Sequence, residues 1–131
     1  MDTAVALVRS YLQMNGFFTI TEYPILESID DTTRTVTDMD ILALRFPGAG
    51  GFHSDAPTGG LRIQPDPALG LGDDQIEVII GEVKEGAASL NKAARDPQVL
   101  AAVLQRFGQM RPEIVAQLVD ELIDTGVAEH P

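Results

Sequence analysis

The stretch that decides the fold runs from residue 76 to residue 84 and reads Ile76-Glu77-Val78-Ile79-Ile80-Gly81-Glu82-Val83-Lys84. It is the strongest strand signal in the chain, because β-branched residues dominate it. Side chains alternate between the two faces of a strand, so one face carries Ile76, Val78, Ile80, Glu82 and Lys84. This face begins as an apolar surface of the kind that forms a core, and it ends in two charges. The change from apolar to charged residues along one face needs an explanation.

A second strand, predicted over Val36–Phe46, shows the reverse order. One of its faces carries Asp38, Asp40, Leu42, Leu44 and Phe46, so the charges come first. The other face carries Met39, Ile41, Ala43 and Arg45, and we expect both faces to be largely covered. No helix is expected between the two strands, which favours antiparallel pairing and places the start of one beside the end of the other. Asp40, Glu82 and Lys84 are then expected to converge.

The remaining elements follow from periodicity and from the placement of Gly and Pro. Apolar residues at three- and four-residue steps predict an amphipathic helix over Thr3–Asn15, which Gly16 ends. Of the 12 Gly and 8 Pro, 7 and 4 lie between Pro47 and Gln75, so residues 47–75 are predicted to be a long surface loop. The other expected elements are a strand at Phe17–Ile25, a turn at Ser28–Arg34, a short extended piece at Leu61–Gln64, a helix that Asp96 caps and Gly108 follows, and a helix from Pro112 to about Asp124. This order of elements indicates a layered α/β (α+β) domain.

Length and composition limit the classes of protein. The chain has 131 residues, a formal net charge of −11 and no Cys. The length suits one small domain, which we expect residues 1–131 to form. Without Cys there is no disulfide scaffold and no zinc–thiolate site, so the expected location is cytoplasmic. No apolar run approaches the roughly 20 residues that cross a bilayer, and the acidic N-terminus is unlike a secretory signal, so no membrane partner is expected. The acidic balance also argues against a protein that coats nucleic acid without specificity.

The converging charges suit a metal site. Facing residues on paired strands have Cβ atoms about 4.5–5.5 Å apart, so two carboxylates can hold one divalent cation between them. Carboxylate ligands fit Mg²⁺ or Mn²⁺. Lys84 would hold a water or a phosphate oxygen against the ion, and these parts suit metal-assisted hydrolysis of a phosphodiester. The alternative is a structural ion pair at the end of the sheet, with the third charge in solvent.

The element order and these residues resemble the PD-(D/E)XK nucleases, which have the restriction-endonuclease-like fold. The resemblance rests on Thr37-Asp38-Met39-Asp40-Ile41-Leu42-Ala43 and Ile79-Ile80-Gly81-Glu82-Val83-Lys84, and it covers roughly residues 2–108. It implies an α-β-β-β-α core in which Asp40 and Glu82 bind the metal with the carbonyl of Val83. By the same resemblance, Lys84 positions or activates the attacking water and Asp38 is an auxiliary acid.

The chain departs from the family at two places. Family members usually have a fourth strand after the second helix, whereas Gly108 here leads into another predicted helix. Residues 112–131 are therefore expected to form an extra helix and tail, and the sheet lacks its usual fourth strand or is completed elsewhere. A homodimer or a protein partner stays open for that reason. Many members also carry an acid on the first helix, for which Asp2 is the candidate in this sequence.

Basic residues gather after the third strand. Residues 84–111 hold 5 of the 9 Lys and Arg against two acids, a net charge of +3. Within this window Lys92, Arg95 and Arg106 are the expected contacts to a nucleic-acid backbone, although scattered charge on helix surfaces is equally common. The predicted function is a Mg²⁺-dependent endonuclease, a hydrolase acting on DNA rather than RNA. Two alternatives are a catalytically inactive nuclease-fold binding or assembly module, and an unrelated domain that docks a partner through residues 112–124.

Overall fold

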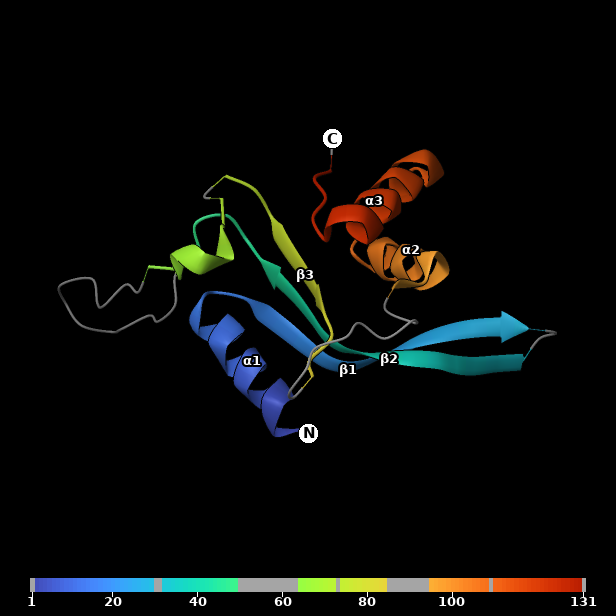
Figure 1. Ribbon diagram of the computed structural model, residues 1–131, viewed down its shortest axis with the longest axis horizontal. Coiled ribbons are helices and arrows are strands. Elements are labelled where there is room, and N and C mark those ends of the chain that lie inside the picture. Colours follow the sequence, from blue (N-terminus) through green and yellow to red (C-terminus); the bar gives the residue numbers. More distant parts are fainter. Residues whose placement is uncertain are drawn as a thin grey trace. The chain divides into compact units, whose positions relative to one another are not determined.

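The computed structural model describes residues 2–29, 32–49, 64–72, 74–84, 95–108 and 110–130. Within them the protein is an α+β structure with a three-stranded sheet in the order β1-β2-β3 (Figure 1). The elements are α1 (Thr3–Met14), β1 (Phe18–Ile29), β2 (Thr32–Arg45), the short 3₁₀ helix η1 (Pro67–Leu69), β3 (Glu77–Gly81), α2 (Pro97–Arg106) and α3 (Pro112–Thr125). The predicted sequence of one helix, three strands and two helices is confirmed.

The chain divides into two compact units. The first unit comprises Met1–Tyr23 and Met39–Ala88, and it contains α1, η1 and β3. The second comprises Pro24–Asp38 and Ser89–Pro131, and it contains α2 and α3. The strands β1 and β2 contribute residues to both units.

The first helix is capped by a side chain at its start and by backbone hydrogen bonds at its end. The carboxylate of Asp2 accepts a hydrogen bond of 2.7 Å from the backbone N–H of Ala4, which satisfies one of the unpaired donors of the first turn. At the other end Gly16 has a φ of +91°, and the N–H groups of Gly16 and Phe17 donate to the carbonyls of Gln13 and Leu12. This pair of bonds is a Schellman motif, so the predicted stop at Gly16 is confirmed.

The core of the first unit lies between α1 and one face of the sheet. Its buried members are Leu12, Phe17, Ile41 and Ala43, and Ile79 of β3 packs against them. The strands β2 and β3 pair antiparallel, with Ile41 opposite Gly81 and Arg45 opposite Glu77. This pairing confirms the predicted antiparallel arrangement. It also fixes which residues of the two strands share a face.

The hairpin between β1 and β2 is longer than the sequence indicated. The expected turn at Ser28–Arg34 is wrong, because β1 continues to Ile29 and β2 begins at Thr32. The segment Thr32-Thr33-Arg34-Thr35-Val36 is polar in composition but rich in β-branched residues, which favour extended backbone. Polarity alone therefore gave the wrong expectation.

The start of β3 is more exposed than expected. On β3 and the residue before it, Val78 is 38% exposed and Ile76 57%, so the apolar start of that face is not core. On β2 the predicted coverage of both faces is confirmed from residue 39 onward, since Met39, Ile41, Leu42, Ala43 and Arg45 are buried, and the 49% exposed Phe46 lies just beyond the strand. The third strand ends at Gly81, earlier than the expected Lys84. When both faces of a strand carry apolar residues, alternation cannot say which face meets the helix.

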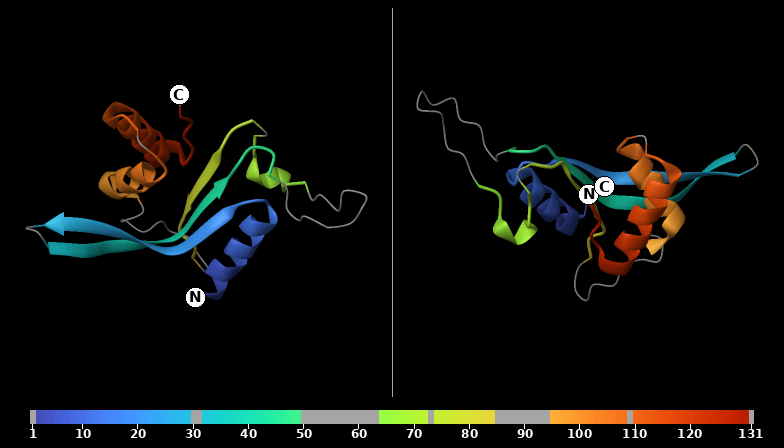
Figure 2. Two further views of the ribbon diagram at one scale, coloured as in Figure 1. Left: turned by 180° about the vertical axis from the view of Figure 1, so that it is seen from behind. Right: turned by 90° about the horizontal axis from the view of Figure 1, so that it is seen from above.

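The second unit contains the paired helices α2 and α3, which lie side by side in Figure 2. Asp96 caps α2 by accepting a 2.8 Å hydrogen bond from the N–H of Gln98, and Pro97 occupies the first turn, as the sequence predicted. The helix α3 ends at Gly126, whose φ is +78°. The buried residues of the pair are Val99, Leu100, Val103, Leu104, Val115, Leu118 and Val119. Among the described residues, no helix is long and apolar enough to span a membrane.

The expected loop at residues 47–75 is described in part. Its described portion contains the short helix η1, which the sequence did not predict. Asp66 begins η1 by accepting a 2.9 Å hydrogen bond from the N–H of Ala68. Of the predicted extended piece at Leu61–Gln64, residues 61–63 lie outside the described residues.

Candidate functional site

The candidate site lies where β3 ends beside β2. The last described pair of the two strands is Ile41 opposite Gly81. Asp40 directly precedes Ile41, and Glu82 directly follows Gly81. These are the two carboxylates that the sequence predicted to converge. The carboxylate oxygen Oδ2 of Asp40 accepts a hydrogen bond of 2.8 Å from the backbone N–H of Val83. The side chain of Asp40 is therefore in contact with the segment that carries Glu82 and Lys84.

The exposure of these residues suits a site that exchanges ligands with solvent. Asp40, Glu82 and Val83 are half-buried, and Lys84 is exposed. The bond from Val83 fixes one oxygen of the Asp40 carboxylate and directs it at the backbone of the third strand. A carboxylate has two oxygens and about four acceptor positions, so one N–H leaves capacity for a cation. The functional roles of the four residues stay predictions.

The donor set decides which metal fits. Among the described residues, no group of three or more His, Asp and Glu side chains is placed to hold a metal ion. The donors in this part of the structure are the carboxylates of Asp40 and Glu82 and the backbone carbonyl of Val83, which are all oxygen ligands. Mg²⁺ is commonly held by one or two carboxylates together with waters and substrate phosphates, so this donor set fits Mg²⁺ or Mn²⁺.

The other predicted site residues do not join this contact. Asp38 is exposed and belongs to the second unit, so the first unit does not hold it. Arg95 and Arg106 are exposed residues of the second unit, before α2 and in its last turn. Lys92 lies outside the described residues. Their expected contacts to a nucleic-acid backbone stay predictions.

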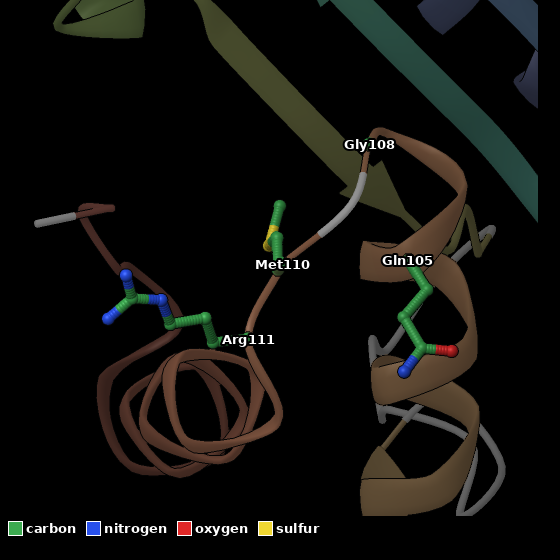
Figure 3. A pocket seen from close by; sticks show the side chains of 4 residues that line it. All are labelled: Gln105, Gly108, Met110 and Arg111. Atoms are coloured by element: carbon green, nitrogen blue, oxygen red, sulfur yellow. The ribbon is translucent and has the colours of Figure 1, made fainter.

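A separate pocket opens at the turn between α2 and α3. Its described lining consists of Gln105, Gly108, Met110 and Arg111, with Gln105 and Arg111 on either side of the turn (Figure 3). This described lining offers one side-chain amide and one guanidinium and no carboxylate, so it lacks the acidic ligands that the site beside β3 has. The predicted contact Arg106 is not among the lining residues.

Sequence reasoning missed a polar cluster at the carboxyl end of α1. Arg45 is only 1% exposed, and its Nε and Nη2 groups donate to the backbone carbonyls of Asn15 and Ala49 at 3.2 and 2.7 Å. Its third nitrogen, Nη1, has no hydrogen-bond partner among the described residues. The guanidinium lies at the end of α1, where helix carbonyls are unpaired and a positive charge is favourable. A single charge on the otherwise apolar face of Met39, Ile41 and Ala43 was the signal for this buried cation.

The same cluster connects the loop to the helix. Asn15 accepts from the backbone N–H of Asp66 at 2.7 Å, and the hydroxyl of Tyr11 donates to Oδ2 of Asp66 at 2.6 Å. The hydrogen bond from Tyr11, followed by the N–H of Ala68, lowers the pKa of Asp66 below its ordinary value of 3.8. The same bond to Asp66 raises the pKa of Tyr11 above 10.0. The cluster holds Ala49 and Asp66, which both belong to the predicted loop at residues 47–75, against the carboxyl end of α1.

Comparison with known proteins adds no assignment. No protein-family model matches the chain, and no curated protein and no solved structure matches it. The contact between Asp40 and the backbone just beyond β3 is the feature of the chain that points most directly to a function.

Proposed function

We propose that this chain is a Mg²⁺-dependent nuclease of the PD-(D/E)XK type that hydrolyses phosphodiester bonds in DNA. The observation that carries the proposal is the 2.8 Å hydrogen bond from the N–H of Val83, two residues after Gly81, to Asp40, which precedes Ile41, the partner of Gly81. It brings the acid of one strand against the Glu-x-Lys segment of the next. The Asp-x-Asp and Glu-x-Lys motifs, which are each common in protein sequences, thus meet through a contact between Asp40 and Val83.

Each residue has a distinct part in the proposed mechanism. Asp40 and Glu82 would hold Mg²⁺ or Mn²⁺ together with the carbonyl of Val83. When bound, the ion would stabilise negative charge on the scissile phosphate and lower the pKa of a coordinated water. Lys84, which is exposed two residues beyond Glu82, would hold that water or a phosphate oxygen through its ammonium group. Asp38 would serve as an auxiliary acid.

The architecture supports this proposal at the level of element order. The described chain runs α1-β1-β2-β3-α2, which is the order of the restriction-endonuclease-like core, and α3 follows as an extra helix. The described sheet has three strands, so a fourth would come from a partner or from a second copy of the chain. In the proposed nuclease, residues 1–131 form one functional domain in the cytoplasm. Lys92, Arg95 and Arg106 would contact the phosphate backbone of DNA, with RNA the less favoured substrate.

The test combines metal binding with cleavage. The wild type is titrated with Mg²⁺ and Mn²⁺ by calorimetry and incubated with single- and double-stranded DNA and with RNA. We expect cleavage only with metal, and we expect Glu82→Gln to lose both metal binding and cleavage. Lys84→Met should lose cleavage and keep metal binding. Glu129→Gln, an exposed acid in the second unit, is the matched control and should behave as the wild type.

The result also separates the second candidate, a catalytically inactive binding or assembly module. That candidate is favoured by the small donor set, since no group of three acids or histidines forms a metal site among the described residues. It predicts that DNA binding, followed by fluorescence anisotropy, needs Arg95 and Arg106 but no metal, and that no nucleic acid is cut. The nuclease proposal fails if neither cation binds with or without DNA and no substrate is cleaved.

A further inference from the structure

The approach of β3 to β2 depends on a glycine. Gly81 is the last residue of β3 and pairs with Ile41 of β2. A Cβ placed on Gly81 would lie 2.7 Å from Cγ2 of Ile41, which is closer than carbon atoms pack. Gly81 does not have a positive φ, so its backbone conformation is open to any residue. Contact with Ile41, and not backbone strain, is what excludes a side chain here.

Ile41 has little freedom to move away. It is 1% exposed and belongs to the buried cluster with Leu12, Phe17 and Ala43. Its branched side chain is stiff about χ1, and close-packed cores resist displacement of a methyl group. A side chain at position 81 would therefore push the end of β3 away from β2, or push Ile41 into its packed neighbours.

The residues next to this contact are those of the candidate site. Asp40 precedes Ile41, and Glu82 and Val83 follow Gly81. The hydrogen bond between Val83 and Asp40 spans the same gap between the strands, directly beside the glycine. A shift of a few tenths of an ångström at Gly81 acts first on this bond and on the separation of the two carboxylates.

From this geometry we infer that Gly81 is a positioning residue, which sets the distance between Asp40 and Glu82 by letting Cγ2 of Ile41 lie over the third strand. The inference rests on the proposed function where it concerns the metal. Its geometric part, the closeness of Val83 and Asp40, is independent of any metal and has its own measurement.

The test is a double-mutant cycle between positions 41 and 81. Ile41→Leu removes the Cγ2 atom and nearly conserves side-chain volume, so the core tolerates it. Gly81→Ala alone should lower the exchange protection of the Val83 amide by about tenfold, because its bond to Asp40 opens. The same substitution in the Ile41→Leu background should change protection by less than about threefold, because the clashing atom is absent. Gly72→Ala is the control: its Cβ meets only the flexible side chains of Gln75 and Asp74.

The metal is the second readout of the same four proteins. Calorimetric titration with Mg²⁺ alone should show that Gly81→Ala binds the ion at least about tenfold more weakly than the wild type. The double variant should bind Mg²⁺ with nearly the affinity of the wild type. The inference is overturned if Gly81→Ala leaves the Val83 amide protected, or if its effect is equal in both backgrounds. If the amide behaves as expected while the wild type binds no Mg²⁺, the geometry holds and the proposed function is what fails.

Discussion

Substitution of Asp40 should separate a structural role from a metal role. Asp40→Ala removes the acceptor for the N–H of Val83. Hydrogen bonds to charged groups contribute roughly 1.5–3 kcal/mol, and this bond is only part-buried, so water replaces some of it. We therefore expect a loss of about 1.5 kcal/mol in the free energy of unfolding. Asp40→Asn keeps an oxygen that can accept from Val83, so its loss should stay below about 0.5 kcal/mol.

Urea unfolding without metal measures this difference. The chain has no Trp and two Tyr, Tyr11 and Tyr23, which both lie in the first unit and so report on the unit that holds Asp40. With a urea slope of about 1.5 kcal/mol/M, Asp40→Ala should lower the unfolding midpoint by about 1 M. The reasoning is refuted if Asp40→Asn is as unstable as Asp40→Ala, since the charge and not the acceptor would then be what the fold requires.

Addition of Mg²⁺ should widen the gap in stability between the wild type and both Asp40 variants. For a site with a Kd of about 1 mM, about 10 mM Mg²⁺ stabilises the wild type by about 1.4 kcal/mol. Neither Asp40→Ala nor Asp40→Asn should gain this increment, because both lack the carboxylate. An equal gain in the wild type and in Asp40→Asn would contradict a cation held by Asp40.

Three further predictions concern residues outside the candidate site. Arg45→Lys should cost about 1–3 kcal/mol in urea unfolding, because one ammonium cannot reach both backbone carbonyls that the buried guanidinium binds. The pKa of Asp66 is lowered in the folded protein. The ionised carboxylate therefore contributes fully to stability when the pH is above the ordinary pKa of 3.8, and this contribution is lost as the pH falls through the lowered pKa. Tyr11→Phe should raise this pKa toward 3.8, as read from the carboxyl carbon shift by NMR. Asp96→Ala should cost about 0.5–2 kcal/mol through loss of the cap on α2, measured by circular dichroism, and Asp96→Asn should restore it.

The sequence predicted the elements whose ends carry a local chemical signal. Gly16 and Gly126 have the positive φ that ends a helix, and Asp96 accepts the hydrogen bond that begins one, so these bounds follow from short-range rules. The turn at Ser28–Arg34 was predicted wrongly because the polar residues from Thr32 to Thr35 are typical of a turn. Their β-branched side chains favour a strand, which is what they form. Local rules compete there, and the long-range pairing of the strands decides between them.

The candidate site could be predicted in its pairing but not in its detail. The alternation of side chains and antiparallel pairing are enough to predict that the charged ends of the two strands meet. The observed pairing of Ile41 with Gly81 agrees with this prediction. The hydrogen bond from Val83 and the contact of Ile41 with position 81 depend on the separation of the strands, which no sequence pattern gives. The position of Arg45 on an apolar face indicates a buried cation, but its partners are backbone carbonyls, which leave no trace in the sequence.

In the proposed site, Asp40 would serve both the fold and a cation, because the two roles use different oxygens of its carboxylate. The strand β3 ends at Gly81, and the N–H of Val83, two residues later, is bonded to a side chain of β2 instead of to its backbone. Oδ2 of Asp40 thus accepts the N–H that follows the end of β3. This bond holds the carboxylate in one orientation without any ligand. In the proposed site, the second oxygen would then face a cation in an orientation set by a hydrogen bond that forms without the metal. A carboxylate held in this way loses less conformational freedom when a cation binds, which favours binding by a site with few protein ligands.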